Sequence, residues 1–237
     1  MIVSFISLGC DKNLVDSEVM LGLLEKRGYS MTDDEAEADI IIVNTCCFIK
    51  DALEESIETI LEMSQYKNPD VGNCKGLIVA GCLGQRYEKE FFDELPEVDA
   101  IIGTTAYESI AEVADEILGG KEQVKQLESI DLAMQDGNGK LRVLSTAPYF
   151  AYLKISEGCD NRCTYCVIPQ MRGRHRSREL ESLVEEATLL AQQGVKELVI
   201  VAQDTSIYGR DLYGKPMLDV LLRRLNAIEG LEWIRLL

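Results

Sequence analysis

Short apolar runs alternate along the chain with longer stretches whose apolar residues recur every three or four positions. Such alternation predicts buried strands followed by helices that pack by one face. In the first half the predicted strands are 2–8, 39–45, 76–80 and 99–103, and the predicted helices are 13–28, 51–65, 85–94 and 107–118. Asn13 is expected to cap the first helix and Gly28 to end it. Residues 1–118 are therefore predicted to form a flavodoxin-like, doubly wound parallel sheet.

The alternation stops at residue 119 and starts again at residue 149. Residues 119–148 are rich in glycine and polar residues, with a turn sequence at Asp136-Gly137-Asn138-Gly139, and are predicted to be a linker or hairpin. The third segment, 149–237, is predicted to form strands 149–155, 197–202 and 232–236, with helices 177–194 and 216–228. Ser177 is expected to cap the first of these helices, and the last strand is expected to be an uncovered apolar edge.

Three cysteines occupy equivalent places in the first half, because Cys10, Cys46 and Cys82 each follow a predicted strand. The carboxyl ends of parallel strands share one edge of a sheet, so these thiols are expected to converge where such folds bind ligands. The alternative is that each is an ordinary small buried residue. Cys47 is expected to face away from this set, and Cys74 to lie at the opposite edge.

A second set of cysteines, Cys159, Cys163 and Cys166, lies in one loop with the spacing Cys-x3-Cys-x2-Cys. Thiolates suit iron–sulfur clusters and zinc. A structural zinc site takes four protein ligands, whereas this loop supplies three and would leave one iron of a four-iron cluster open to a small molecule. The spacing favours a catalytic cluster, with a zinc site as the alternative.

Composition narrows the class of protein. Eight cysteines in 237 residues, without a secretory leader or a membrane-length apolar run, favour metal chemistry in the cytoplasm over a disulfide framework. The net charge of −17 is uneven: residues 1–148 carry 12 Lys and Arg against 29 Asp and Glu, and residues 149–237 carry 12 against 12. The acidic half is either a solubilising surface or a surface for a basic protein, and it disfavours direct nucleic-acid binding.

The cysteine loop and its flanks resemble the radical S-adenosylmethionine (SAM) methylthiotransferases. The resemblance rests on residues 157–169, where Tyr165 takes the aromatic position before the last cysteine, and on Arg172-Gly173 and Ser177-Arg178. It extends to residues 7–18, 44–49 and 81–86 around the other cysteines, where Asp11 replaces the proline usual in the family. Residues 7–18 and 203–209 are most similar to the branch that modifies an aspartate of a small-subunit ribosomal protein.

This resemblance implies two 4Fe-4S clusters. One, on Cys159, Cys163 and Cys166 with Tyr165 beside the cofactor, would bind and cleave SAM to a radical that removes hydrogen from an unactivated carbon. The other, on Cys10, Cys46 and Cys82, would supply sulfur for a methylthio group placed on the aspartate β-carbon. The implied partners are the ribosomal protein and an electron donor. Two alternatives stay open: a tRNA adenosine methylthiotransferase and a non-catalytic electron-transfer module.

Arg172, Arg174, Arg176 and Arg178, with His175, form a basic segment that is either a solvated loop or a contact for the SAM carboxylate or an acidic substrate. His175 is expected at the surface. The third segment resembles only the first part of the family's partial (β/α) barrel, and the family's C-terminal nucleic-acid-type domain has no counterpart here. We therefore expect a truncated chain that is inactive alone and that meets nucleic acid only through the missing domain or the ribosome.

Overall fold

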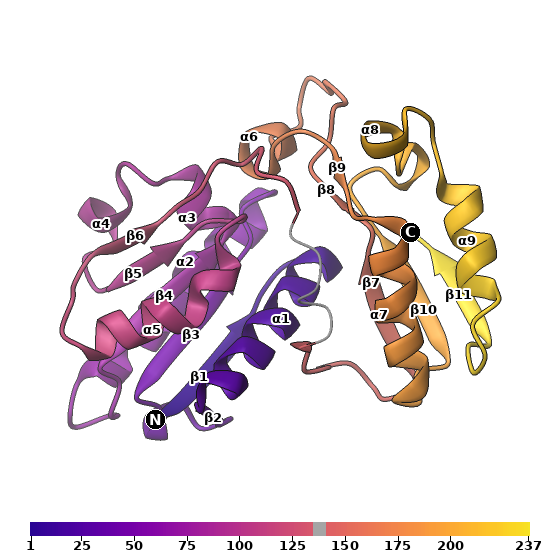
Figure 1. Cartoon of the computed structure of the whole chain (residues 1–237). Helices are drawn as coiled ribbons and strands as arrows, with labels where there is room; N and C mark the ends of the chain where they lie inside the picture. Colours follow the sequence, from indigo (N-terminus) through magenta and orange to yellow (C-terminus); the bar gives the residue numbers. More distant parts are fainter. Residues whose placement is uncertain (135–140) are drawn as a thin grey trace. The chain divides into compact units, whose positions relative to one another are not determined.

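The computed structural model describes residues 1–134 and 141–237, so the predicted turn at Asp136–Gly139 lies outside the described residues. The chain divides into two compact units, residues 1–130 and 131–237. Each unit is built on a parallel β-sheet with helices packed on it (Figure 1). In the part of the chain that is described, no helix is both long and apolar enough to cross a membrane.

The first unit contains a six-stranded parallel sheet in the order β2-β1-β3-β4-β5-β6. Its strands are β1 (Ile2–Ser7), β2 (Ser30–Met31), β3 (Ile40–Thr45), β4 (Gly76–Gly81), β5 (Ala100–Ile102) and β6 (Val124–Gln126). The order of the first five strands is that of the flavodoxin-like fold, which confirms the predicted fold class. The chain reverses its direction of travel across the sheet between β1 and β3, where such folds place their ligand sites.

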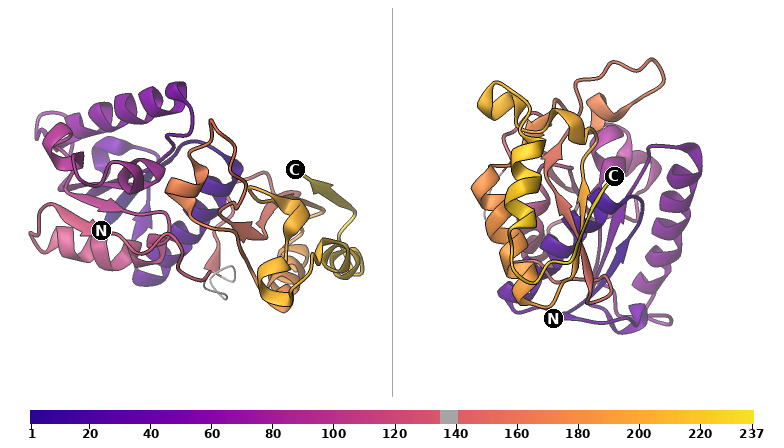
Figure 2. Two further views of the ribbon diagram at one scale, coloured as in Figure 1. Left: turned by 90° about the horizontal axis from the view of Figure 1, so that it is seen from above. Right: turned by 90° about the vertical axis from the view of Figure 1, so that its right-hand side faces the viewer.

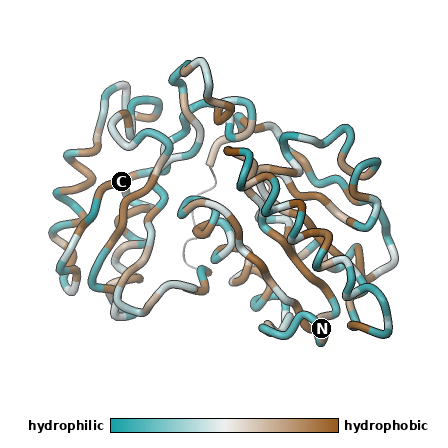
Figure 3. The backbone as a smooth tube through the Cα atoms, turned by 180° about the vertical axis from the view of Figure 1, so that it is seen from behind, coloured by the Kyte–Doolittle hydropathy of each residue, from teal (hydrophilic) through white to brown (hydrophobic). Residues whose placement is uncertain are grey.

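Helices cover both faces of this sheet. They are α1 (Asp11–Arg27), α2 (Lys50–Ser64), α3 (Cys82–Arg86), α4 (Phe91–Glu94) and α5 (Ile110–Leu118), with short 3-10 helices at Glu35–Glu37, Gln65–Lys67 and Tyr107–Ser109. Figure 2 shows α2 on one side of the sheet, with α1 and α5 on the other. Buried on both faces, β3 and β4 are apolar over nearly their whole length, as the brown segments of Figure 3 show.

Two details of the helices in the first unit differ from prediction. Cys10 is the N-cap of α1, whereas Asn13 lies buried inside its first turn. Gly28 ends α1 in a left-handed conformation (φ 98°), as predicted. The single helix predicted at 85–94 is two short helices, and the break between them allows Phe91 and Phe92 both to be buried.

Strand β6 lies inside residues 119–148, which were predicted to be a linker. The predicted linker therefore begins before the first unit ends. Strand β6 pairs in parallel with β5, and Val124 packs against the core of the first unit. An edge strand of three residues carries too short an apolar pattern to be distinguished from a loop.

The second unit contains a three-stranded parallel sheet in the order β11-β10-β7 and a short antiparallel pair, β8 with β9. The strands are β7 (Phe150–Lys154), β8 (Ser156–Glu157), β9 (Arg176–Ser177), β10 (Glu197–Val201) and β11 (Trp233–Leu236). The helices are α6 (Ile168–Arg172), α7 (Leu180–Gln192), α8 (Arg210–Tyr213) and α9 (Leu218–Asn226), with a 3-10 helix at Thr205–Ile207. Side chains of α7 and α9 form one core with β7 and β10.

Ser177 does not cap α7. The cap residue is Glu179, and Ser177 belongs to β9, where it pairs with Ser156. The Ser177 hydroxyl accepts a hydrogen bond from the backbone N–H of Gly209 at 2.8 Å. Ser177 lies three positions before α7 and is used for a tertiary contact. Its local sequence does not distinguish this role from that of a helix cap.

A buried carboxylate connects α7 to the rest of the second unit. Glu186 lies 2.6 Å from Arg142 and 2.7 Å from Arg178, and all three side chains are at least nine-tenths buried. Burial alone would raise the pKa of Glu186, but the two guanidinium groups outweigh it and hold the pKa below its ordinary value. The Glu186 side chain is therefore an anion, and its removal takes a counter-charge away from two buried guanidinium groups.

We expect Glu186→Ala to lower the free energy of unfolding of the second unit by about 3–5 kcal/mol, since breaking a buried ion pair leaves uncompensated charge. Urea unfolding followed by near-UV circular dichroism measures this. The matched control on the same helix is Glu181→Ala, which breaks an exposed pair with Arg224 and should have a far smaller effect. Because its folded pKa is depressed, the contribution of Glu186 is present above pH 4.5 and is lost as pH falls through the folded pKa. Equal losses in the two variants would contradict this assignment.

Candidate functional site

Cys10, Cys46 and Cys82 lie at the carboxyl ends of three adjacent strands, as predicted. Cys10 is the N-cap of α1 three residues after β1, Cys46 directly follows β3, and Cys82 begins α3 directly after β4. Because β1, β3 and β4 are neighbours in a parallel sheet, the three loops emerge side by side at one edge. Cys10 is exposed, whereas Cys46 and Cys82 are buried.

Gly9 brings the first two of these loops into contact. It has φ 92°, and a Cβ built on it would lie 2.5 Å from Cβ and 3.1 Å from Sγ of Cys46. Any larger residue would clash with the neighbouring cysteine, so the glycine is required both by its backbone conformation and by this close approach. The backbone preceding Cys10 therefore lies directly against Cys46.

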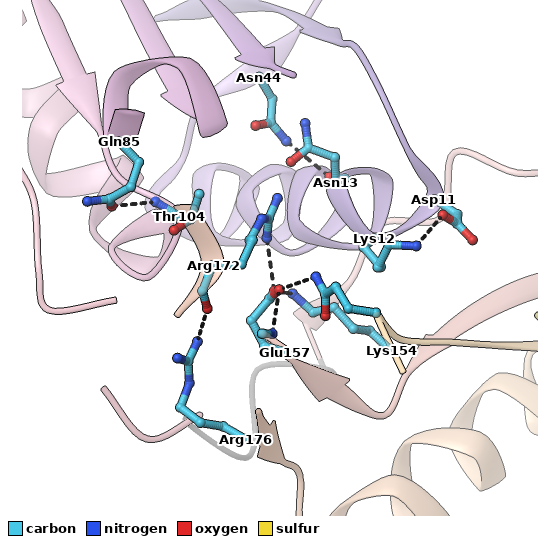
Figure 4. A network of polar contacts seen from close by, with 12 residues as sticks. Asp11, Lys12, Asn13, Asn44, Gln85, Thr104, Lys154, Glu157, Arg172 and Arg176 are labelled. Atoms are coloured by element: carbon cyan, nitrogen blue, oxygen red, sulfur yellow. Dashed lines mark hydrogen bonds and ion pairs between the residues drawn. The ribbon is translucent and has the colours of Figure 1, made fainter. Parts of the chain in front are cut away.

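Buried polar side chains connect the three loops. The Asn13 amide donates to the Thr45 carbonyl at 3.0 Å. The Asn44 amide donates to the Asn13 carbonyl at 3.0 Å, as Figure 4 shows. The Thr45 hydroxyl donates to the Ala80 carbonyl at 2.7 Å and accepts from the Leu83 N–H at 3.3 Å. These bonds run from α1 to the end of β3 and on to the end of β4, so they hold the segments that carry the three thiols.

Two further cysteines of the first unit are buried. Burial raises the pKa of Cys47 to about 12, and a neighbouring Cys82 adds to the rise while Arg86 opposes it. The expectation that Cys47 faces away from the set stays a prediction. Cys74 lies just before β4, at the opposite edge as predicted, with its thiol 3.2 Å from the Gly76 carbonyl.

In the second unit, the loop with Cys159, Cys163 and Cys166 projects from β8. Cys159 is buried at its start, Cys166 is half-buried, and Cys163 is exposed. The Cys166 N–H donates to the Cys163 carbonyl at 3.0 Å, which closes a turn around Tyr165. The Tyr165 side chain is 83% exposed. The tip of this loop, with Cys163 and Tyr165, is thus open to incoming groups, whereas Cys159 is covered.

The two ends of this loop meet at its base. Gly158 has φ 76°, and a Cβ there would collide with the backbone oxygen of Arg174. The Cys159 N–H donates to the Gly173 carbonyl at 3.1 Å, next to the β8–β9 pair. The segment that enters the loop is therefore bonded to the segment that leaves it.

Glu157 is a buried anion at that base. Its carboxylate accepts hydrogen bonds from Lys154 at 3.0 Å, Arg172 at 2.9 Å, Gln203 at 2.6 Å and the Gly158 N–H at 3.2 Å (Figure 4). Burial alone would raise the pKa of Glu157, but the cations of Arg172 and Lys154 outweigh it and hold the pKa well below its ordinary value. Its partners come from β7, from α6 beyond the loop and from the end of β10, so one charge connects three segments.

The basic segment is not a solvated loop. Arg172, Arg176, Arg178 and His175 are all buried, and Arg174 is exposed. Arg172 binds Glu157, Arg178 binds Glu186, and Arg176 donates to the Arg172 carbonyl at 3.0 Å. These cations are engaged by groups of the protein itself, and the sequence could not indicate this because the pairing depends on how the fold places β8, α6 and α7 relative to one another.

His175 was expected at the surface, and this expectation is wrong. Its ring Nε2 lies 3.1 Å from the Ser177 hydroxyl and 3.8 Å from Asp211. Burial lowers the pKa of His175, and the negative charge of Asp211 opposes that shift. Its backbone N–H donates to the Asp160 carboxylate at 3.1 Å, which fastens the residue after Cys159 to the segment entering β9.

The loop after β10 also contacts the cysteine loop. Asn161 donates from its amide to the Asp204 carboxylate at 2.9 Å, and Asp204 in turn accepts from the Ser206 hydroxyl at 2.6 Å. Asp204 therefore orients Asn161, which lies between the first two cysteines of the loop. Sequence reasoning did not single out Glu157 or Asn161, because their significance depends on partners more than 40 positions away.

Across residues 1–134 and 141–237, no group of three or more His, Cys, Asp or Glu side chains is arranged to hold a metal ion. The cysteine ligand sets named above stay predictions.

Two family models match the chain. Residues 2–103 match an uncharacterized protein family, UPF0004, and residues 153–236 match the radical SAM superfamily. The chain is 58% identical over 234 residues to the ribosomal protein uS12 methylthiotransferase RimO of Lachnoclostridium phytofermentans and 55% identical over 240 residues to that of Acetivibrio thermocellus. The chain belongs to the radical SAM methylthiotransferase family. In both cases 99% of the chain matches 52% of the relative, so it spans about half the length of the curated methylthiotransferases.

Solved structures of radical SAM enzymes share the fold of this chain. The methyltransferase TsrM from Kitasatospora setae matches 94% of the chain with a TM-score of 0.63 at 16% identity, over 50% of its own length. The cobalamin-dependent enzyme OxsB matches 94% of the chain with a TM-score of 0.52 at 16% identity, over 36% of its length. At these identities the similarity establishes the fold alone.

We expect Gly158→Ala to open the base of the cysteine loop, because the new Cβ meets the Arg174 carbonyl. The control is Gly214→Ala in the same unit, where φ is 71° and a Cβ meets nothing within 4 Å. The control should cost about 1–2 kcal/mol of left-handed strain, and Gly158→Ala should cost more and lower iron bound after anaerobic reconstitution. Denaturant unfolding and iron analysis measure the two effects. Equal stability and equal iron in both variants would refute the clamped loop.

Proposed function

We propose that this chain carries the cluster-binding units of a methylthiotransferase that adds a methylthio group to the β-carbon of an aspartate in a small-subunit ribosomal protein. The observation that carries the proposal is the loop of Cys159, Cys163 and Cys166, which is clamped at its base by the bond from the Cys159 N–H to the Gly173 carbonyl and is exposed at Cys163. Membership of the family and high identity to proteins named uS12 methylthiotransferases support the substrate class.

The residues present fit a 4Fe-4S cluster in the second unit. Cys159, Cys163 and Cys166 would hold three irons and leave the fourth for SAM, with Tyr165 beside the cofactor. When bound, the cluster and SAM supply one-electron chemistry able to remove hydrogen from an unactivated carbon. The protein contributes a rigid base: Glu157 neutralises two buried cations there and connects three segments, so the loop keeps one geometry.

The first unit fits a second 4Fe-4S cluster, held by Cys10, Cys46 and Cys82, that presents sulfur. The hydrogen bonds of Asn13, Asn44 and Thr45 fix the positions of the three loops relative to one another. Because Cys10 is exposed, one side of the cysteine set is accessible. An electron donor is required as a further partner. We place the activity in the cytoplasm, without a membrane, and the acidic first unit disfavours direct contact with nucleic acid.

Alanine at Cys159, Cys163 or Cys166 should abolish SAM cleavage and lower the iron content, because two thiolates do not retain the cluster. Anaerobic reconstitution, iron and sulfide analysis and chromatography of the cleavage products measure both. The controls are Cys47→Ala and Cys74→Ala, which should keep the iron of the parent chain. SAM cleavage at the normal rate in any of the three variants would contradict the assignment of these cysteines as ligands of the SAM-cleaving cluster.

The substrate and the second cluster are tested together in a chain extended to the length of the relatives. Mass spectrometry should find a methylthio group on the ribosomal protein and none on tRNA offered in parallel. With Cys10, Cys46 and Cys82 all changed to Ala, SAM cleavage should persist while transfer stops, because the cleaving cluster lies in the other unit. Modified tRNA would overturn the substrate, and continued transfer by the triple variant would overturn the sulfur-supply role.

We further propose that residues 1–237 alone bind SAM weakly and are inactive. A ligand at the mouth of a (β/α) barrel takes contacts from loops after several strands, and this unit contributes three parallel strands. Each missing hydrogen bond is worth about 0.5–1.5 kcal/mol, so six of them would reduce affinity by several orders of magnitude. Calorimetric titration of SAM into the reconstituted chain and its extended form should differ accordingly. Equal micromolar binding by both would refute this.

A further inference from the structure

The first unit contains an apolar pocket that the proposed chemistry does not use. It has a volume of about 320 Å³, and its walls are formed by α2 and by the segment from α3 to Leu95. The apolar lining consists of Leu53, Ile57, Leu83, Tyr87, Phe91 and Leu95. This volume is at the lower end of the range for ligand pockets, enough for one bulky side chain or a small molecule.

Carboxylates border this apolar lining. Glu90 and Glu94 line the pocket and are solvent-exposed, and among the described residues neither forms an ion pair. Leu61, one helical turn beyond Ile57, is 43% exposed and extends the apolar surface along α2. We call the pocket, Glu90, Glu94 and Leu61 together the α2 groove.

The charge of the α2 groove decides between classes of occupant. Nucleic acid is disfavoured, because phosphates would face Glu90, Glu94 and a chain half with 29 acidic against 12 basic residues. A purely apolar occupant would cover two carboxylates without giving them partners, which costs desolvation energy. An apolar group flanked by cations satisfies both the lining and its border, and charge complementarity of this kind also speeds encounter.

We propose that the α2 groove is the docking site for a basic segment of a partner protein. A bulky Leu, Phe or Trp side chain of that segment enters the pocket, and Lys or Arg residues beside it contact Glu90 and Glu94. A buried apolar anchor surrounded by weaker polar contacts is the usual distribution of energy in protein interfaces. This surface is distinct from the predicted cluster site, although Leu83 of its lining directly follows Cys82, and peptide binding to it can be measured without assembled clusters.

A displayed library of random 12-residue peptides, selected on the 237-residue chain, tests the proposal without assuming a partner. The selected peptides should carry a bulky apolar residue flanked by Lys or Arg. Their affinity, measured by fluorescence anisotropy, should fall at least tenfold in the double variant Glu90→Lys/Glu94→Lys, because two attractive contacts become repulsive. Ile57→Ala should weaken peptide binding about threefold at unchanged net charge. If the double variant does not fold, unchanged affinity in Ile57→Ala would contradict the proposal.

The matched control is Asp33→Lys/Glu37→Lys, which changes net charge equally at two exposed positions outside the pocket. It should change affinity less than twofold. Selected peptides without cations, or equal weakening by the two double variants, would overturn the proposal. Concentration-dependent dimers in sedimentation that disappear in Glu90→Lys/Glu94→Lys would instead assign the α2 groove to a second copy of the chain.

Discussion

Parallel strand pairing is the constraint on which both candidate centres depend. In a parallel sheet every strand ends at the same edge, so residues that follow neighbouring strands are brought together whatever their separation in the chain. Cys10, Cys46 and Cys82 lie at the same edge because β1, β3 and β4 are neighbours. In the second unit, Glu157 and Gln203 meet because β7 and β10 pair in parallel and their following segments leave the same edge.

The two units stabilise their loops by different means. In the first, neutral side chains on Asn13, Asn44 and Thr45 donate to backbone carbonyls at the strand ends. In the second, buried charges hold the segments together, since Glu157 binds two cations at the base of the cysteine loop and Glu186 binds two more behind α7. Removing a carboxylate from water costs free energy, so Glu157 and Glu186 are stable as buried anions only because each lies against two cations. This favours one loop geometry over many.

The acidic first unit carries its cysteine loops and the α2 groove on different surfaces. Its cysteine loops lie at the carboxyl edge of the sheet, whereas the α2 groove lies on the face that α2 covers. An anionic, partly apolar face fits a basic protein better than a nucleic acid, in keeping with a ribosomal protein as the proposed substrate. The groove and the predicted cluster site are different surfaces of one unit, and they adjoin at Leu83, which lines the pocket and directly follows Cys82.

The sequence by itself determined the order of strands and helices along the chain, the flavodoxin-like class of the first unit and the position of three cysteines at strand ends. Apolar periodicity is a local property, so it can be read without knowledge of the tertiary structure. The sequence also determined the family, through the spacing of Cys159, Cys163 and Cys166 with their flanks. Only the tertiary structure decided the roles of side chains whose partners are distant. Asn13 and Ser177 resembled helix caps and instead make long-range contacts, and His175 and three of the four arginines resembled a solvated loop and are buried. The physical reason is that capping, solvation and burial use the same polar residue types, and which one occurs depends on what the fold places opposite them.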